Sequence, residues 1–367
     1  MSDLSSPARP SDGSKAVLGI ESSCDETGVA LVTGDRRILA ETLTSQLDQH
    51  APFGGVVPEI AARAHLEILD RLIAEVMDDA DLDFDDLAGV AVTAGPGLIG
   101  GLITGLVTAK AIAAVHKRPL LAINHLEAHA LTARLTHESL AFPYLLLLVS
   151  GGHCQLLLVK AVGRYRRLGT TLDDALGEAY DKAAKMLNLG YPGGPAIETA
   201  ARSGDPARFP FPRPMVGKPN CHFSFSGLKT ALRRTIQDLG ANSLVAPDLN
   251  DLAASFQTAA IDSLIDRTAQ ALAQTEQENY RPTALVVAGG VAANAYLKDQ
   301  LDTLARRSGL ELVVPPPRLC TDNGVMIAWA GIERLRLGWQ DGLDARARAR
   351  WPLDPTAEPA IGAGVKA

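Results

Sequence analysis

The sequence has few of the features that hold small secreted proteins together or anchor a chain in a membrane. Its 367 residues include four cysteines, Cys24, Cys154, Cys221 and Cys320, with no Cys-x-x-Cys pair. This usage indicates free thiols in a reducing compartment. Residues 1–14 are rich in Ser, Pro and Asp and lack the apolar core of a signal peptide, and no uninterrupted run of 18 apolar residues occurs. We therefore expect a cytoplasmic protein that does not contact a membrane.

Aromatic residues and positive charge are also scarce. Aromatics make up 5% of the chain, and the formal net charge is −7 at pH 7. Such a chain lacks the electrostatic footprint of a protein that binds nucleic acid by itself, so any such binding needs a local basic patch or a partner. The basic run 164–167 and a helix beginning at Lys229 are candidate patches, but both could equally be solvated faces. The 47% hydrophobic and 21% charged residues are ordinary for a globular enzyme.

The length and an internal similarity indicate a duplicated two-lobed fold. A single hydrophobic core stops growing at ~250–300 residues, which this chain exceeds. Residues 16–32 and 144–160 share one pattern: an apolar strand, a short turn of small and polar residues, and a second apolar strand. We expect a disordered tail at 1–15, a first α/β lobe at 16–140 completed by a helix at 325–338, a second lobe at 141–324 with an insertion at about 161–235, and a C-terminal tail at 339–367.

Hydrophobic periodicity and turn residues predict an alternation of strands and helices. The predicted strands are 16–20, 28–32, 38–44, 89–93, 120–123, 144–149, 154–160, 284–288 and 311–314. The predicted helices are 59–79, one ending at His116, one beginning near His125, 173–189, one from Lys229, 249–275, one ending at Arg307, and 325–338. The run 190–195 and the Pro-rich residues 203–222 predict irregular structure.

A pair of histidines suggests a metal site. Asn124 ends an apolar run and is a good N-cap, so His125 and His129 fall on one face of the helix that follows. Glu127 lies roughly 200° around the axis from His125 and faces elsewhere. Asp322, in a short loop before a helix, is the best third ligand, and two His with one carboxylate suit Fe(II) or zinc. The alternatives are a chance His pair and an Asp322 that merely caps its helix.

Three glycine-containing turns, 21–28, 150–153 and 289–294, each follow an apolar strand. Backbone N–H groups in such turns bind phosphate, which favours a nucleotide, although all three could be structural. None ends in the Gly-Lys-Ser/Thr of a P-loop. A literal Gly-x-Gly-x-x-Gly occurs at 95–100, but the next strand ends in Asn124-His125 rather than in an acidic residue, which weighs against NAD.

Taken together and in this order, the motifs resemble the bacterial TsaD family, the tRNA N6-adenosine threonylcarbamoyltransferases, formerly labelled O-sialoglycoprotein endopeptidases. The motifs are GIESSCDET (19–27), AGPG (94–97), NHLEAH (124–129), VSGGH (149–153), GGVAAN (289–294) and TDNG (321–324). The resemblance covers roughly residues 16–338 and leaves only the two tails outside it.

The resemblance implies an actin/Hsp70/sugar-kinase-like (ASKHA) fold with a nucleotide in a cleft between the lobes. It implies transfer of the threonylcarbamoyl group from threonylcarbamoyl-AMP to the exocyclic amine of the adenosine beside the anticodon of tRNA, with a TsaB-type paralogue and a TsaE-type ATPase as partners. One divalent metal, Fe(2+) or alternatively Zn(2+), would be held by His125, His129 and Asp322. The adenylate would be held by Leu148, Val149, Ser150, Gly151, Gly152, Asp181, Gly194 and Asn294.

An adenine amine is a poor nucleophile and must lose a proton, so a carboxylate near the reacting carbonyl is expected. We nominate Asp25 as this base. One rival interpretation is a zinc peptidase, but such enzymes place Glu directly after the first His, whereas Glu127 is two residues from each. A second rival is a non-enzymatic nucleotide-binding scaffold, in which a metal would have no task. A sugar kinase would need a catalytic Asp that the sequence does not locate.

Overall fold

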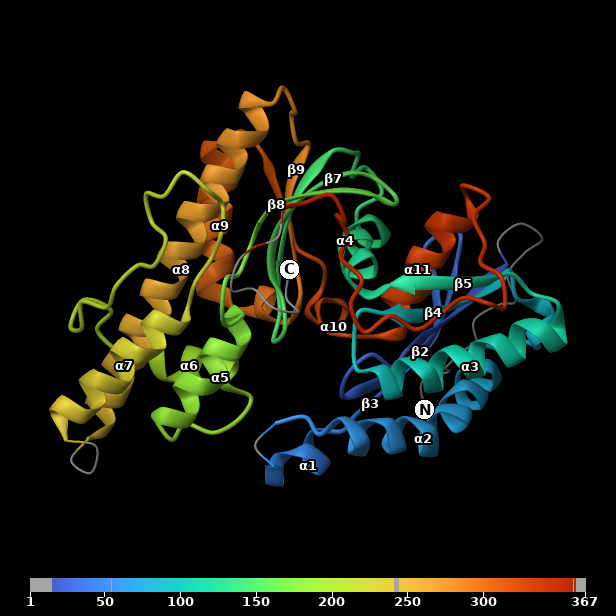
Figure 1. Ribbon diagram of the computed structural model, residues 1–367, viewed down its shortest axis with the longest axis horizontal. Helices are drawn as coiled ribbons and strands as arrows, with labels where there is room; N and C mark the ends of the chain where they lie inside the picture. Colours follow the sequence, from blue (N-terminus) through green and yellow to red (C-terminus); the bar gives the residue numbers. More distant parts are fainter. Residues whose placement is uncertain (1–14, 54, 241–243, 359, 361–367) are drawn as a thin grey trace, which may run out of the picture. The chain divides into compact units, whose positions relative to one another are not determined.

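The computed structural model describes residues 15–53, 55–240, 244–358 and 360 (Figure 1). The predicted N-terminal tail therefore lies outside the described residues, apart from Lys15. The chain forms two compact units. Unit 1 consists of Met1–Glu138 and Asp322–Leu353, and unit 2 of Ser139–Thr321 and Asp354–Ala367.

Unit 1 is built on a five-stranded sheet with the order β3-β2-β1-β4-β5. Its strands are β1 (Ala16–Glu21), β2 (Glu26–Thr33), β3 (Ile38–Ser45), β4 (Gly89–Gly95) and β5 (Leu120–Asn124). The first three form an antiparallel meander, and β4 and β5 continue parallel to β1. Because β1, β4 and β5 run in one direction, their carboxyl ends meet at one edge of the sheet. Polar residues follow each of these strands, which makes this edge the natural place for a site.

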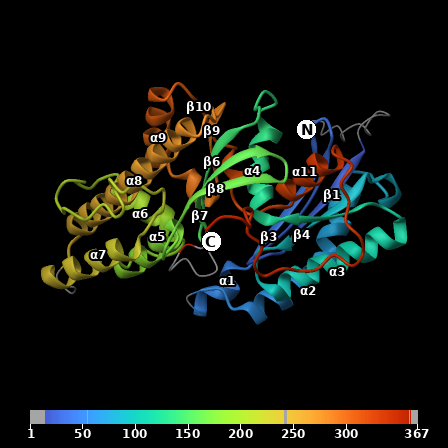
Figure 2. The ribbon, with the colours of Figure 1, turned by 45° about the horizontal axis from the view of Figure 1, so that its top comes forward.

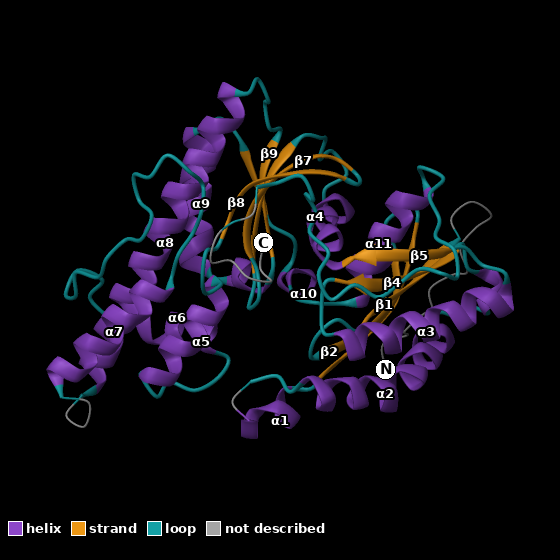
Figure 3. Ribbon diagram, viewed as in Figure 1, coloured by secondary structure: helices purple, strands orange, loops and turns teal. Residues whose placement is uncertain are grey.

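Helices cover both faces of this sheet (Figure 3). The helices of unit 1 are α1 (Leu47–His50), η1 (Ala51–Phe53), α2 (Pro58–Asp79), η2 (Phe84–Asp86), α3 (Ile99–His116), α4 (His125–Thr136) and α11 (Gly324–Leu335). α11 packs on β1 and β2, while α2 and α3 pack together on the other face. α11 lies so close that a Cβ atom at Gly19 would stand 2.2 Å from the carbonyl oxygen of Gly324.

Unit 2 repeats the same topology. Its sheet has the order β10-β9-β6-β7-β8, with an antiparallel meander β6-β7-β8 and parallel β9 and β10. The strands are β6 (Tyr144–Val149), β7 (Cys154–Ala161), β8 (Arg164–Thr170), β9 (Ala284–Ala288) and β10 (Glu311–Val313). The two sheets correspond strand for strand, so the duplication inferred from the two hairpins is confirmed.

The helices of unit 2 are α5 (Leu176–Met186), α6 (Gly193–Ala201), α7 (Ser226–Leu239), α8 (Ala246–Gln277), η3 (Gly290–Ala293), α9 (Ala295–Arg307) and α10 (Pro317–Cys320). In Figure 2, α8 and α9 run alongside each other, and α9 also packs on β10. Among the described residues, one helix, α3, is long and apolar enough to cross a membrane by length and composition. It packs against α2 and β4.

Three segments differ from the sequence-based expectation. Residues 164–167 form β8 rather than the start of an insertion, because an edge strand tolerates charged side chains. α6 begins inside the run predicted to be irregular, since Pro195 lies in its first turn, where its missing N–H is not needed. Residues 339–353 are not loosely held. The backbone of Asp341 bonds to Leu120, and that of Arg348 bonds to Ala94.

Candidate functional site

The first two turns of α4 carry two of the candidate metal ligands, His125 and His129. The Asn124 side chain accepts hydrogen bonds from the N–H groups of Leu126, at 2.9 Å, and Glu127, at 3.3 Å. This N-cap confirms the predicted helix start and places His125 at the first helical position, at the carboxyl edge of the sheet. His125 and His129 are both buried, and their ring centroids lie 4.7 Å apart. The two imidazoles therefore do face one common point.

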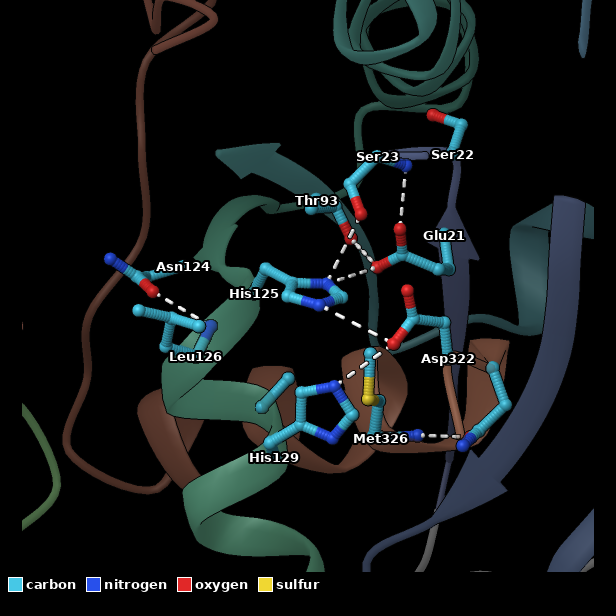
Figure 4. A network of polar contacts seen from close by, with 12 residues as sticks. Glu21, Ser22, Ser23, Thr93, Asn124, His125, Leu126, His129, Asp322 and Met326 are labelled. Carbon is cyan, nitrogen blue, oxygen red and sulfur yellow. Dashed lines mark hydrogen bonds and ion pairs between the residues drawn. The ribbon is translucent and has the colours of Figure 1, made fainter. Parts of the chain in front are cut away.

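Asp322 completes a triad at that point (Figure 4). Its Oδ1 atom lies 3.0 Å from Nε2 of His129 and 3.4 Å from Nε2 of His125. One ligand atom from each residue can be chosen so that all three lie within 4.8 Å of one another. Metal–nitrogen and metal–oxygen bonds of about 2.0–2.2 Å require ligand atoms roughly this far apart. The donor set thus fits a divalent metal ion, and both the spacing and the chemistry admit Fe(2+) or Zn(2+).

The position of Asp322 differs from the expectation in two respects. It belongs to unit 1, not to the second lobe, because α11 packs directly on the sheet of unit 1. Nor is it the helix cap. Asn323 occupies the N-cap of α11 and accepts the N–H of Met326 at 2.9 Å. The capping alternative is therefore wrong, and the Asp322 carboxylate is directed at the two histidines instead.

The triad is strongly coupled electrostatically. Burial by itself would lower the pKa of His125, but the carboxylates of Asp322 and Glu21 raise that pKa well above its ordinary value. Burial would raise the pKa of Asp322, but the two histidines hold it well below its usual range. Without a metal ion, His125 therefore carries a positive charge between two carboxylates. A divalent ion must displace its proton, so metal binding releases a proton at this site.

Glu21 joins the triad and is a residue that the sequence reasoning missed. It is fully buried at the end of β1, and its Oε2 atom accepts the Nδ1–H of His125 at 3.1 Å. Its Oε1 atom accepts the backbone N–H of Ser23 at 2.6 Å, and the Thr93 hydroxyl donates to Oε2. The one signal in the sequence is an acidic residue directly after an apolar strand. By itself that signal does not show which side chain the carboxylate meets.

Glu127 faces away from the triad, as expected. Its carboxylate accepts a hydrogen bond from Nε of Arg334 at 2.6 Å. It is therefore held in an ion pair and is not placed to activate a water molecule at the two histidines. The peptidase interpretation loses the general base that it requires.

Two further carboxylates, Asp25 and Glu26, lie at the end of the turn after β1 and at the start of β2. Asp25 is half-buried, and its backbone carbonyl accepts the N–H of Gln46. No contact between the Asp25 side chain and the triad is present among the described residues, so its role as a base stays a prediction. Its neighbour Glu26 is also half-buried. Burial and the carboxylates of Asp322 and Asp25 raise the pKa of Glu26 to about 8.

The residues expected to hold an adenylate gather at one edge of unit 2. They are Leu148 and Val149 at the end of β6, Ser150, Gly151 and Gly152 in the next turn, Asp181 in α5, Gly194 in α6 and Asn294 before α9. Because β6 and β9 are parallel neighbours, the turns that follow them leave the same edge of the sheet. The first turn of α5 contacts the first of these loop turns, because the N–H of Gly177 donates to the carbonyl of Ser150 at 3.2 Å. α5 also packs against α6 and η3.

Some of these residues have free space around them, and others are already hydrogen-bonded within the protein. Cβ atoms added at Gly151, Gly152 and Gly194 would meet nothing within 4 Å, so these backbones are accessible to a ligand. Asp181 accepts the N–H of Gly193 at 2.7 Å, and burial raises its pKa. Asn294 is engaged at both ends of its amide, because it caps α9 and donates to Gln257 at 3.0 Å.

Several residues of the two basic patches are engaged by neighbouring groups. The Arg166 guanidinium pairs with Glu278, and the backbone N–H of Arg167 is bound by the Asp354 carboxylate at 2.9 Å. Lys229 donates to Asp174 at 2.7 Å. These contacts favour a structural role for Arg166, Arg167 and Lys229.

Comparison with known proteins confirms the resemblance. The sequence profile of TsaD, described as tRNA N6-adenosine threonylcarbamoyltransferase, matches residues 37–329. A protein of that name from Paramagnetospirillum magneticum is 60% identical over 341 residues, which cover 93% of this chain and 98% of the relative. One from Novosphingobium aromaticivorans is 59% identical over 356 residues, covering 96% of this chain and 99% of the relative.

Solved structures show the fold alone. HypF from T. kodakarensis superimposes with a TM-score of 0.57 at 15% identity, over 89% of this chain and 48% of that protein. A full-length HypF in a phosphate- and nucleotide-bound form gives a TM-score of 0.56 at 13% identity, over 87% of this chain and 55% of that one. Together with the two duplicated sheets, these likenesses show the ASKHA fold. The chain belongs to the TsaD family of tRNA N6-adenosine threonylcarbamoyltransferases.

Proposed function

We propose that this chain transfers the threonylcarbamoyl group from threonylcarbamoyl-AMP to the exocyclic amine of the adenosine beside the anticodon of tRNA, releasing AMP. The observation that carries this proposal is that full-length relatives at 57–60% identity all bear this enzyme name. The motif residues that the relatives' family implies as metal ligands also come together in unit 1. Because its substrate is tRNA, we expect the enzyme to act in the cytoplasm.

His125, His129 and Asp322 would hold one divalent metal, for which Fe(2+) is our first choice and Zn(2+) our second. When bound, such an ion supplies a Lewis acid for the negative charge that develops on carbonyl or phosphate oxygens. The protein contributes a pre-oriented set of ligands, two of them buried and one half-buried, so little reorganisation is needed at the moment of reaction.

The turns of unit 2 supply the donor's binding site in this proposal. Backbone N–H groups of Gly151 and Gly152 would orient the phosphate, since a Cβ atom at either glycine would meet nothing within 4 Å. Ser150 would hold the shape of this turn, because its own N–H already donates to the carbonyl of His153 at 2.8 Å. Asp181 and Gly194, on the helices next to that turn, would hold the adenosine part. Holding donor and acceptor together supplies much of the rate by itself. Asp25 remains our candidate for the group that takes the proton of the attacking amine, with Glu26 as its nearest competitor.

Two protein partners belong to the proposal, a TsaB-type paralogue and a TsaE-type ATPase. An exposed apolar surface on α2 and α3 supports the paralogue as its occupant. Ile103 and Val107 lie one turn apart on α3 and are 49% and 58% exposed, and Leu66 on the adjacent α2 is 72% exposed. Exposed large aliphatic side chains grouped on two packed helices are typical of a protein interface. A paralogue of the same fold would offer an equivalent helix pair. The chain's net charge of −7 also indicates that tRNA binding needs partners.

A reconstituted transfer assay tests the function. The purified chain, both partners, tRNA and threonylcarbamoyl-AMP are incubated, and digested nucleosides are analysed by mass spectrometry for threonylcarbamoyladenosine. We expect product with the wild-type chain and a severe loss with His125→Ala. Absence of product with a folded wild-type chain that binds both partners would refute the proposal. Metal-dependent cleavage of a glycoprotein under the same conditions would revive the peptidase interpretation.

A further inference from the structure

The two histidines of the triad have very different surroundings on the side away from Asp322. Nδ1 of His125 is hydrogen-bonded to the Glu21 carboxylate at 3.1 Å and lies 3.2 Å from the Ser23 hydroxyl. Nδ1 of His129 is buried and, within the described part of the chain, has no hydrogen-bond partner. Only His125 is therefore held from behind by a charged group, although both rings present Nε2 to the same carboxylate oxygen.

Every oxygen of the Glu21 carboxylate has an assigned donor. Oε1 receives the backbone N–H of Ser23, and Oε2 receives Nδ1–H of His125 and the Thr93 hydroxyl (Figure 4). The donors come from the turn after β1, from β4 and from α4. The carboxylate is completely buried, so its cost of desolvation has to be offset by these bonds. A buried charge at a junction of three elements is hard to explain as packing alone.

We propose that Glu21 is the positioning residue that fixes His125 as a metal ligand, and that it ties the metal to the turn at 21–28. By accepting Nδ1–H, the carboxylate leaves Nε2 of His125 without a proton and directed at the metal. Through the Ser23 N–H bond, the same carboxylate orders the turn that contains Asp25 and leads into β2 at Glu26. This inference rests on the proposed metal at the triad.

The surroundings of Glu21 predict how an isosteric amide would behave. In Glu21→Gln, the Ser23 N–H still requires an acceptor, which places the amide oxygen at the Oε1 position. The NH₂ group then occupies the Oε2 position and donates to Nδ1 of His125, while the Thr93 hydroxyl can rotate to accept. A histidine that accepts at Nδ1 carries its proton on Nε2, where the metal should bind. The substitution should therefore disfavour metal binding without removing a ligand.

The test is the affinity of the chelator-treated, full-length protein for Zn(2+), measured by competition with a fluorescent chelator, together with the absorption spectrum of the Co(2+) form. We expect Glu21→Gln to weaken Zn(2+) binding by roughly 10–100-fold, the range typical of lost outer-shell partners of metal-bound histidine. The matched control is Glu127→Gln. It removes another buried glutamate, on α4 itself, whose partner is Arg334 rather than a metal ligand. It should bind Zn(2+) with wild-type affinity even if it unfolds at a lower temperature.

A wild-type Zn(2+) affinity in folded Glu21→Gln, or an equal loss in both variants, would overturn the inference. If Glu21→Gln does not fold, the protonation of His125 in the zinc-loaded wild-type protein tests the inference instead. Long-range ¹H–¹⁵N spectra should show His125 with its proton on Nδ1, hydrogen-bonded and slow to exchange, and a proton on Nε2 would contradict the proposal. If the wild-type chain binds neither Zn(2+) nor Fe(2+) at the triad, the proposed metal fails instead, so the two failures can be told apart.

Discussion

Oδ1 of Asp322 lies 3.0 Å from Nε2 of His129, although 193 residues separate them in the sequence. The contact depends on the tight packing of α11 against β1 and β2, since Asp322 directly precedes the N-cap of that helix. Asp322 and α4 therefore belong to one unit, and the metal site does not require a second body to complete it. The candidate metal centre is thus a property of unit 1.

Replacing Asp322 by Asn should abolish tight metal binding while leaving the fold intact. The amide is nearly isosteric but neutral, and a divalent ion would lose its only anionic ligand in the triad. We expect at least a tenfold loss in Zn(2+) affinity and a comparable or larger loss of transfer activity, measured by dialysis with metal analysis and by nucleoside mass spectrometry. Asn323→Ala serves as a control for the helix cap. It should cost about 1 kcal/mol of stability, the usual value of an N-cap, and leave the ligands in place.

The metal-free protein should lose stability as the pH rises above neutrality. The pKa of His125 is raised well above its ordinary value in the folded state, so the folded protein holds a proton that the unfolded chain releases near pH 6.5. The stability that this proton contributes is fully present below about pH 6.5 and is lost as the pH rises through the folded pKa. Thermal unfolding of chelator-treated protein between pH 6 and 9 measures the effect. His125→Ala should flatten this dependence, and an unchanged slope in that variant would contradict the assignment.

The sequence predicted this site in part. The spacing of His125 and His129 and the N-cap at Asn124 are local features, so the helix and its two-histidine face could be inferred from neighbouring residues. Asp322 was proposed because it stands in a short loop before a helix. That helix was assigned to the first lobe, but the loop before it was not, since the lobe boundary was placed at residue 324 and the structure has it before Asp322. Glu21 shows the limit more clearly. Its partners come from three elements, and no spacing rule connects them.

The elements of the fold likewise divide into those that local sequence predicts and those that depend on tertiary contacts. Both sheets follow from repeated hairpins and apolar runs, because a buried strand depends mainly on its own residues. β8 and α6 were missed because tertiary context overrode local signals. Four charged or polar residues can form an edge strand when a hydrogen-bonded neighbour is available, and a proline is harmless in a first helical turn. Residues 339–353 gave no periodic signal, and their order comes from backbone bonds to β4 and β5.

Gly19→Ala should destabilise unit 1 and disturb the triad together. The added Cβ would lie 2.2 Å from the carbonyl oxygen of Gly324 and 2.4 Å from the backbone nitrogen of Ala328, so α11 must move. We expect a loss of about 1–3 kcal/mol, as for overpacked cores, and weaker Zn(2+) binding because Asp322 moves with the helix. Gly34→Ala is the control, since its Cβ would meet nothing within 4 Å. A destabilised Gly19→Ala protein with wild-type Zn(2+) affinity would show that Asp322 does not depend on this packing.

Val107→Glu should weaken binding of the TsaB-type paralogue without affecting the metal site. The side chain is 58% exposed on α3, so a charge costs little in the free chain but would be buried in the proposed interface. We expect at least a tenfold rise in the Kd measured by titration calorimetry, with an unchanged unfolding temperature. Val216→Glu, at a residue 44% exposed in unit 2, is the matched control. If wild type and Val107→Glu bind the paralogue with equal Kd, the interface does not include this face of α3.

Asp25→Asn and Glu26→Gln should separate the two candidates for the general base. If Asp25 takes the proton of the attacking amine, Asp25→Asn should lower kcat by 10²–10⁴-fold, the usual contribution of such a group, while Zn(2+) affinity stays unchanged. Glu26→Gln should then retain most activity, because its carboxyl group is raised in pKa to about 8 and is largely protonated at neutral pH. Single-turnover transfer from threonylcarbamoyl-AMP at several pH values provides the measurement. Near-full activity of Asp25→Asn together with an inactive Glu26→Gln would identify Glu26 as the general base. The single-turnover rate of the wild-type enzyme should then rise as the pH passes through 8.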